Sequence, residues 1–295
     1  MYQMCRTFKI RNLIMPNHKR HSLLCPNCKK LISISEKRCP YCGTAHPAAW
    51  WKNNVWTRGF NDPYLLVKTI IGVNVGIYVL SLLLNPKGLG SAMNPLTFLS
   101  PSGQILELLG ATGKVPVDVY HRYWTLVSAN YLHGGILHIF FNMAAFRQLG
   151  LLVAREYGVY RMFIIYALGG VIGFLVSYLA SVAWTIGASA SVCSLAGALL
   201  YYGKSRGGVY GRTIYKQIGV WVIILFIFGL LVPMINNWGH GGGIAAGIGL
   251  GFLLGYQENK KENILHKLLA GSCAVLTLLI LGWVVLSGIY YRFMV

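Results

Sequence analysis

Serine, histidine and asparagine occur in three short motifs of this 295-residue sequence, each at the start of an apolar segment. The motifs are "HGGILHIFFN" at residues 133–142, "GAS" at 187–189 and "GHGGG" at 239–243. A serine hydroxyl can attack a carbonyl carbon, and a nearby histidine can take its proton. The candidate residues for such nucleophilic chemistry are His133, His138, Asn142, Gly187, Ser189 and His240.

The segments that must position these residues are those of a membrane protein. Hydrophobic side chains make up 55% of the sequence, and the mean hydropathy of +0.55 is too high for an ordinary soluble domain. Five windows are long and apolar enough to cross a bilayer as helices, and two shorter glycine-rich windows bring the expected number to seven. The windows are 65–84, 136–153, 160–180, 189–202, 218–234, 239–256 and 268–290.

Positive charge is distributed unevenly along the sequence, which has a formal net charge of +19. Lys and Arg are concentrated in residues 1–58 and in every second gap between the expected helices. This is the positive-inside pattern, and it predicts a cytoplasmic amino terminus. Topology and attraction to the anionic lipid bilayer account for the charge, so nucleic acid is not the favoured partner. Compact loops and inward positive charge favour a bacterial cytoplasmic membrane.

The three motifs are expected to meet at one depth in the membrane. With a cytoplasmic amino terminus, the second, fourth and sixth helices all enter from the outer face, and each begins with one of the motifs. His138 and Asn142, four residues apart, share a helix face. Glycines at 243, 247, 251 and 255 form a stripe on the sixth helix that allows close approach of a neighbouring backbone. We therefore expect Ser189 and His240 to lie within hydrogen-bonding reach.

Other hydrolytic chemistries lack a residue that they need. A zinc protease would require H-E-x-x-H, whereas His133 and His138 are five apart with no carboxylate between them. The lysines near the fourth helix lie at its inner end, and none of the seven acids lies inside an expected span. The pattern G-x-S-x-G is also absent. A Ser189–His240 dyad without an orienting carboxylate remains.

In order and in helix number, these motifs resemble those of the rhomboid intramembrane serine proteases, over roughly residues 60–292. The resemblance implies a six-helix catalytic core, here followed by one extra carboxyl-terminal helix. It implies that Ser189 is the nucleophile and His240 its base, and that His138, Asn142 and the Ser189 backbone N–H stabilise the oxyanion. Gly187 matches the glycine of the motif, and His133 matches an outer histidine with a supporting role.

Two positions depart from the family pattern. Ala190 replaces the glycine that usually follows the serine, and its methyl group is expected to narrow the pocket. Trp124 is followed by Thr125 where the family often has Trp-Arg, with Arg122 two residues upstream. The predicted function is cleavage of transmembrane-protein substrates near the outer membrane face, at small or helix-breaking residues. The alternatives are an inactive rhomboid-like protein that binds membrane helices and, with less support, a channel or transporter.

Four cysteines precede the first span in a C-x2-C, ten-residue, C-x2-C array: Cys25, Cys28, Cys39 and Cys42. Four thiolates suit structural Zn²⁺, and a reducing cytoplasm disfavours disulfides. The array resembles a short zinc ribbon, with Cys5, His18, His21 and His46 as spare ligands and a cytoplasmic protein as one candidate partner. The predicted organisation is a basic tail (1–20), a zinc-ribbon head (21–46), a linker (47–63), an all-α membrane core (64–256) and an additional transmembrane helix (257–295).

Overall fold

The computed structural model describes residues 22–26, 28, 30–50, 62–84, 98–232 and 235–293. The chain divides into two compact units, Met1–Arg58 and Gly59–Val295. The tail predicted for residues 1–20 lies outside the described residues, as do most of the linker and the spare ligands Cys5, His18 and His21.

The first unit, which we call the head, contains a small antiparallel hairpin. Its strands are β1 (Ser22–Leu24) and β2 (Leu31–Ser33), in a register that pairs Leu23 with Ile32. Ile32 is buried together with Cys25 and Cys39, so the core of the head is built largely around thiols. Such a small apolar core is insufficient to fold a segment of this length without a further crosslink or metal.

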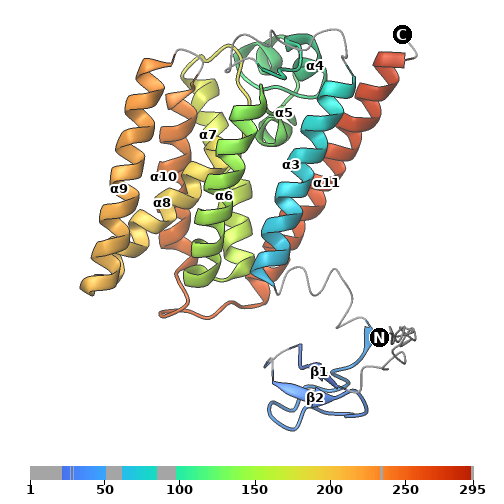
Figure 1. Ribbon diagram of the computed structural model, residues 1–295, viewed down its shortest axis with the longest axis vertical. Coiled ribbons are helices and arrows are strands. Elements are labelled where there is room, and N and C mark those ends of the chain that lie inside the picture. The colour runs from blue at the N-terminus through green and yellow to red at the C-terminus, as the bar shows by residue number, and fades with distance from the viewer. Residues whose placement is uncertain are drawn as a thin grey trace, which may run out of the picture. The chain divides into compact units, whose positions relative to one another are not determined.

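Seven long helices and four short ones lie in the described part of the second unit (Figure 1). The long helices are α3 (Pro63–Leu83), α6 (Ile136–Tyr157), α7 (Val159–Leu179), α8 (Ser189–Arg206), α9 (Gly208–Leu231), α10 (Asn237–Leu254) and α11 (Ile264–Phe293). The short ones, between α3 and α6, are α4 (Gly103–Leu108), η1 (Val115–Val119), α5 (Thr125–Ser128) and η2 (Ala129–Tyr131). The sequence analysis did not identify these four short helices.

Local sequence explains where several long helices begin and end. Asp62 caps α3 by accepting a hydrogen bond from the backbone N–H of Tyr64 at 2.9 Å, and Pro63 occupies the first helical position. Gly158 joins α6 to α7 with φ = 101°, and Gly207 joins α8 to α9 with φ = 65°. These positive φ values favour glycine.

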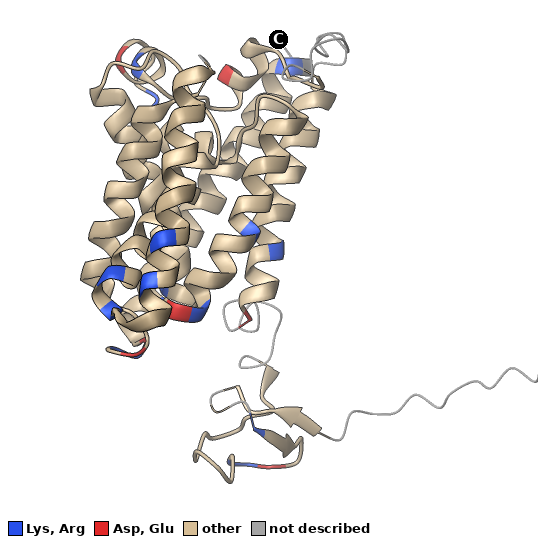
Figure 2. Ribbon diagram, turned by 60° about the vertical axis from the view of Figure 1, so that its left-hand side comes forward, with Lys and Arg blue, Asp and Glu red and all other residues tan. Residues whose placement is uncertain are grey.

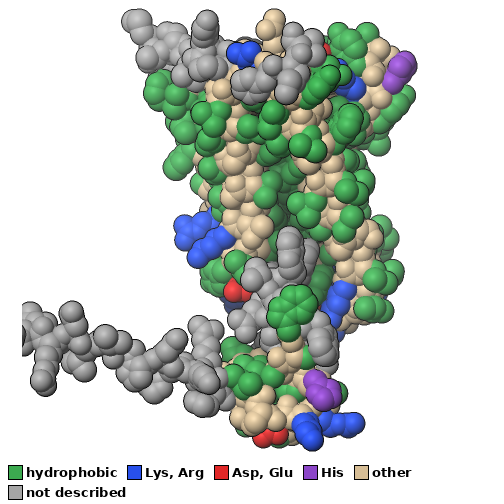
Figure 3. All heavy atoms as spheres, turned by 90° about the vertical axis from the view of Figure 1, so that its right-hand side faces the viewer, with side chains coloured by type: hydrophobic (Ala, Val, Ile, Leu, Met, Phe, Trp, Pro, Cys, Tyr) green, Lys and Arg blue, Asp and Glu red, His purple; other side chains and the backbone are tan. Residues whose placement is uncertain are grey.

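Five helices are long and apolar enough to cross a membrane, by length and composition: α3, α6, α7, α9 and α11. Hydrophobic side chains cover much of the face shown in Figure 3 between its two ends. The glycine-rich α8 and α10 have 18 residues each and pack against each other and against α7; most of α8 is buried, whereas α10 keeps one exposed face. Helix α9 begins ten residues earlier than the predicted window, because Arg212 and Lys216 lower the hydropathy of its first turns. The fold class, an all-α polytopic membrane protein with a small cysteine-rich head, is confirmed.

The two ends of the bundle differ sharply in charge (Figure 2). We call the end at which α3 begins the basic end and the opposite end the site end. The described residues of the site end include three Lys or Arg residues, namely Lys114, Arg122 and Arg292. The basic end holds eleven: Lys68, Arg147, Arg155, Arg161, Lys204, Arg206, Arg212, Lys216, Lys260, Lys261 and Lys267.

The connection between α10 and α11 is bound tightly to the basic end. Arg161 is fully buried and donates hydrogen bonds to the carbonyl oxygens of Leu254, Gly255 and Lys260. Its positive charge thus lies at the carboxyl end of α10, where the helix dipole favours a cation. The Glu262 carboxylate accepts a hydrogen bond from the Arg161 backbone N–H at 3.0 Å, at the amino end of α7.

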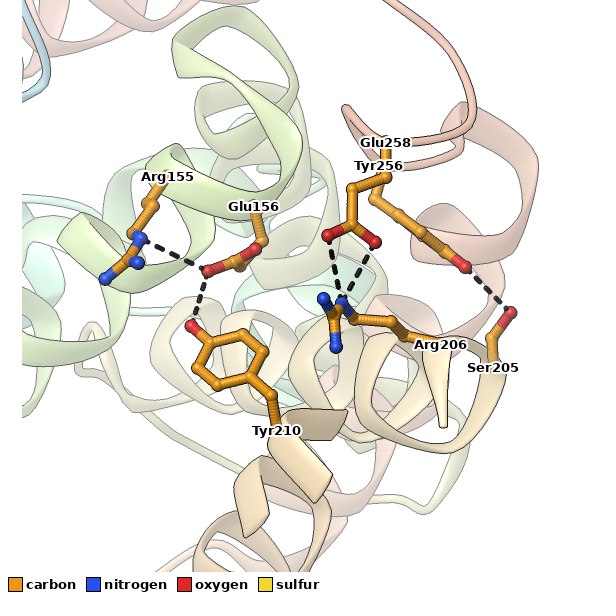
Figure 4. Close-up of polar contacts among 7 residues, drawn as sticks. All are labelled: Arg155, Glu156, Ser205, Arg206, Tyr210, Tyr256 and Glu258. Atoms are coloured by element: carbon orange, nitrogen blue, oxygen red, sulfur yellow. Dashed lines mark hydrogen bonds and ion pairs between the residues drawn. The ribbon is translucent and has the colours of Figure 1, made fainter. Parts of the chain in front are cut away.

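Further polar contacts join the same end of the bundle (Figure 4). Arg206 at the end of α8 forms an ion pair with both carboxylate oxygens of Glu258, at 2.9 and 3.0 Å. Glu156 at the end of α6 accepts a hydrogen bond from the Tyr210 hydroxyl at 2.7 Å. Together with Asp62, which caps α3, and Glu262, these contacts place four of the seven acids of the chain at the basic end, each with a partner.

Candidate functional site

Ser189 is the first residue of α8, at the site end, and is half-buried. The segment before it is fixed by backbone hydrogen bonds to the α3–α6 connection. Thr185 and Thr112 exchange N–H···O bonds of 2.7 and 3.0 Å, and the Gly187 N–H donates to the Ala129 carbonyl at 2.9 Å. The backbone N–H groups of the first turn of α8 have no partner within the helix, so they are available to an anion at this position.

His138, in the first turn of α6, is oriented toward the same position. Its Nδ1 accepts a hydrogen bond from the Gly134 N–H at 3.2 Å. An accepting Nδ1 in a neutral imidazole leaves the proton on Nε2, which then acts as a donor. A Cβ placed on Gly187 would lie 2.7 Å from this Nε2 and 3.6 Å from the Ser189 Oγ. Gly187, with φ = 123°, therefore keeps open the space that His138 and Ser189 both border.

Asn142 and His133 are both placed beside His138. Asn142 lies one turn further along α6, and its Nδ2 donates to the His138 carbonyl at 2.9 Å. An amide nitrogen carries two hydrogens, so one remains for another acceptor. His133 is fully buried, with its ring edge-on to that of His138 at a centroid distance of 5.1 Å. Neither ring nitrogen of His133 has a hydrogen-bond partner among the described residues.

His240 lies in the first turn of α10, which packs directly against α8. The two backbones touch where glycine leaves no side chain: a Cβ on Gly243 would overlap the Ala190 carbonyl, and one on Gly247 the Ser194 carbonyl. Gly243 is within one turn of His240, and Ala190 is adjacent to Ser189. The structure thus brings Ser189 and His240 to adjoining first turns of two closely packed helices.

The His240 ring is almost completely buried, with 5% of the residue exposed, and its Nδ1 has no hydrogen-bond partner in the described part of the chain. Nδ1 is the atom that a carboxylate orients in a Ser-His-Asp triad. The described acids at the site end are Glu107 and Asp118, and neither is a partner of this nitrogen. Asp118 instead accepts a hydrogen bond from the Tyr178 hydroxyl at 2.8 Å. The arrangement fits a dyad better than a triad.

Asn236 fixes the beginning of α10. Its Oδ1 accepts a hydrogen bond from the Gly239 N–H at 3.0 Å, which makes it the N-cap of the helix. Its Nδ2 donates to Ser177 Oγ of α7 at 2.6 Å and to Thr185 Oγ1 at 3.0 Å. Because Thr185 precedes Ser189 by four residues, one amide ties the helix of His240 to the segment that carries the serine.

The two serines that follow Ser189 in the first turns of α8 make hydrogen bonds away from the site. Ser191 donates to Asn130 Oδ1 at 2.9 Å, and Ser194 donates to the Ile165 carbonyl at 2.9 Å. The Ala190 methyl group is buried in a cluster with Ala129 and Phe174. The expectation that Ala190 narrows the pocket therefore does not hold, because this methyl group lies in the helix interface.

The four head cysteines form a second candidate site. Their Sγ atoms all lie within 4.8 Å of one another, with 3.7 Å between Cys25 and Cys42 and 3.6 Å between Cys28 and Cys39. These distances are too long for disulfides. Zn–S bonds of about 2.3 Å in a tetrahedron give S···S separations of about 3.8 Å, close to those observed. The cluster could hold a metal ion.

Two residues important to this geometry were missed in the sequence analysis. Gly134 was only part of a motif, although its N–H determines which nitrogen of His138 carries the proton. Asn236 was one of two asparagines before His240, and its position just before the expected helix was an available signal for a cap.

Comparison with known proteins gives one family. Residues 120–257 match the model of the Rhomboid domain. RHOMBOID-like protein 6, mitochondrial, from Arabidopsis thaliana is 30% identical over 224 residues, which cover 67% of this chain and 73% of that protein. Rhomboid protease GluP of Bacillus subtilis is 38% identical over 137 residues, or 46% of this chain and 27% of GluP.

Coverage of the relatives is uneven. RHOMBOID-like protein 4 from Arabidopsis thaliana is 29% identical over 208 residues, and the match spans 64% of this chain but about half, 52%, of that relative. These relatives come from a plant and a bacterium, and most are from the plant, so they do not support the expected bacterial membrane over any other.

Proposed function

The chain belongs to the rhomboid family, and from this membership and the site geometry we propose that it is an intramembrane serine endopeptidase. Ser189 is the nucleophile and His240 the general base of a dyad. The observation that carries the proposal is the close glycine packing of α8 on α10, which brings the first turns of the two helices together. The substrates are transmembrane helices, cut near the site end of the bundle.

In the proposed reaction, His240 Nε2 takes the proton of the Ser189 hydroxyl as Oγ attacks the carbonyl carbon of the scissile bond. The oxyanion that forms accepts hydrogen bonds from His138 Nε2–H, from Asn142 and from the Ser189 backbone N–H at the amino end of α8. His240 then gives its proton to the leaving amine nitrogen as the C–N bond breaks. In the second half of the reaction, His240 takes a proton from water as the water oxygen attacks the acyl carbon, and it returns a proton to Ser189 Oγ as the ester C–O bond breaks.

Each supporting residue has a role in this scheme. His133 packs edge-on against His138 and limits rotation of its ring. Gly187 leaves the space between His138 and Ser189 open to the substrate carbonyl. A helical substrate hides its carbonyls in hydrogen bonds, so sites of cleavage carry small or helix-breaking residues.

The proposed topology puts the basic end, and with it the amino terminus, in the cytoplasm. Eleven Lys or Arg residues at that end against three described at the other agree with the positive-inside rule. Ser189 then faces the outer side. The cytoplasmic thiol cluster is proposed to hold structural Zn²⁺, since all four ligands are cysteines and no position is left for a reacting water.

Labelling with a fluorophosphonate probe tests the dyad. The purified chain in detergent should be labelled, and the Ser189→Ala and His240→Ala substitutions should each abolish labelling. Both variants should unfold at about the temperature of the unsubstituted chain, which shows that they are folded. Ser191→Ala is the matched control: this hydroxyl is two residues away but bonds Asn130, so labelling should persist. A folded chain that takes no label would instead indicate a rhomboid-like protein that binds membrane helices without cutting them.

Metal analysis tests the head. The purified chain should contain one zinc ion, and Cys39→Ser should lose it, whereas Cys193→Ser in α8 should retain it. A chain without zinc whose head thiols react freely with an alkylating reagent would refute the metal assignment.

A further inference from the structure

The head carries an exposed apolar patch on the outer face of its hairpin. Leu24 and Leu31 are cross-strand partners on this face, and they are 58% and 63% exposed. Tyr41, between the cysteines of the second C-x2-C pair, is 58% exposed. Their neighbours Leu23 and Ile32 point the other way, toward the thiols. A domain this small cannot bury both faces of the hairpin by itself.

Positive charge accompanies the patch. Lys30 is adjacent to Leu31, and its ammonium group lies 4.6 Å from the centre of the Tyr41 ring. Figure 3 shows hydrophobic and basic side chains together on the surface of the head. Residues 1–58 contain eleven Lys or Arg and one acid, Glu36, so this part of the chain has a formal net charge of +10. The chemistry of the surface is therefore apolar, aromatic and cationic.

The covalent connection limits what the patch can reach. The described part of the head ends at Trp50, and α3 begins at Pro63. The thirteen residue steps from Trp50 to Pro63 span at most about 47 Å when fully extended. The head therefore remains within that distance of the bilayer that α3 enters, and a lipid surface is its permanent neighbour.

We propose that the patch formed by Leu24, Lys30, Leu31 and Tyr41 rests on the anionic lipid surface of the membrane that its own chain spans. Leucine and tyrosine side chains enter the interface, where an amphipathic ring is favoured, and the ammonium group meets lipid phosphates. The basic residues elsewhere in the first 58 positions add electrostatic attraction to anionic lipid. This docking does not depend on the proposed protease activity.

Photo-crosslinking in the full chain tests the proposal. The photoreactive residue p-benzoylphenylalanine is placed at Tyr41, and the chain is reconstituted in nanodiscs that contain phosphatidylglycerol or only phosphatidylcholine. Ser35 is the matched control. It is exposed, but it follows Ser33 at the far end of β2, whereas the Leu24–Leu31 pair lies at the start of that strand. We expect lipid adducts at position 41 several-fold more often than at position 35, and fewer without phosphatidylglycerol or at high salt.

A second position and a folding check keep the result interpretable. The same photoreactive residue at Leu31 should also give lipid adducts, and Leu24→Ser should reduce the yield at position 41. Unchanged protection of the four head thiols against alkylation shows that each variant is folded. Equal yields at positions 41 and 35, yields that ignore lipid charge, or adducts mainly to protein or nucleic acid would each overturn the proposal.

Discussion

Replacing Gly243 by alanine tests whether the α8–α10 contact sets the geometry of the candidate dyad. A Cβ at this position would meet the Ala190 carbonyl oxygen, closer than Cβ atoms approach in real proteins, and Ala190 is adjacent to Ser189. The obstacle is backbone and cannot rotate away. Gly249 is the matched control on the same helix, because a Cβ there has nothing within 4 Å.

The size of the effect follows from the contact. Restoring an ordinary carbon–oxygen separation requires α8 and α10 to move apart by on the order of 1 Å. Overpacking of this kind costs about 1–3 kcal/mol of stability. A misplacement of about 1 Å between reacting groups can lower a rate by about 100-fold. Gly249→Ala should instead stabilise α10 at this exposed position by up to about 1 kcal/mol.

The assay measures the rate of fluorophosphonate labelling and the thermal unfolding temperature for both variants in the same detergent. Gly243→Ala should be labelled about 100-fold more slowly at a temperature where it remains folded, and Gly249→Ala at the unsubstituted rate. Normal labelling of Gly243→Ala would refute the argument that glycine packing positions Ser189 against His240. An equal loss in Gly249→Ala would show that the effect is general to the helix.

Three further predictions concern residues around the site and at the basic end. Asn236→Ala should lower the free energy of unfolding by about 1–2 kcal/mol through loss of the N-cap. Asn236→Asp keeps the accepting oxygen, so its unfolding temperature should fall less, and equal decreases would contradict a capping role. Ala190→Gly should leave the labelling rate unchanged and cost about 1–2 kcal/mol, from one buried methyl group and helix propensity; faster labelling would mean that the methyl group does obstruct the site. Burial raises the pKa of Glu262 above its ordinary value of 4.5, so the folded state disfavours the charged carboxylate and stability should fall as pH rises through the interval from 4.5 to the raised pKa. Glu262→Gln should remove this part of the pH dependence of the unfolding temperature, and an unchanged profile would assign it to other groups.

Hydropathy and residue spacing predicted the long helices because these signals are local. The four-cysteine array at residues 25–42 and the three polar motifs could be recognised equally well, since each depends on residue type at short spacing. The shorter α8 and α10 were predicted only with the help of their glycine stripes and flanking loops. Their close packing on each other explains their weak hydropathy: close backbone packing requires small residues, which contribute little to an apolar signal.

Contacts between distant segments could not be predicted in the same way. The backbone exchange of Thr112 with Thr185 joins positions 73 residues apart and depends on no particular side chain. The charge pattern of the sequence gives Arg161 no role beyond a positive charge near a helix end, yet it is fully buried against the end of α10. A sequence indicates that a charge is present, but burial depends on whether carbonyl groups of another element surround it.

His240 Nδ1 has no partner among the described residues, and this determines which of the two charges that develop in the proposed transition state is stabilised. In a triad, a carboxylate stabilises the imidazolium that forms when the histidine takes the serine proton. No described residue supplies that stabilisation to His240, whereas several donors are proposed for the oxyanion. The first N–H groups of α8 have no partner within the helix, and the Gly134 N–H leaves His138 with its donor at Nε2. We therefore expect the transition state of the proposed reaction to depend more on oxyanion donors than on stabilisation of the base, and we expect the Gly134 N–H to affect the rate through His138, whose Nε2 it leaves as a donor.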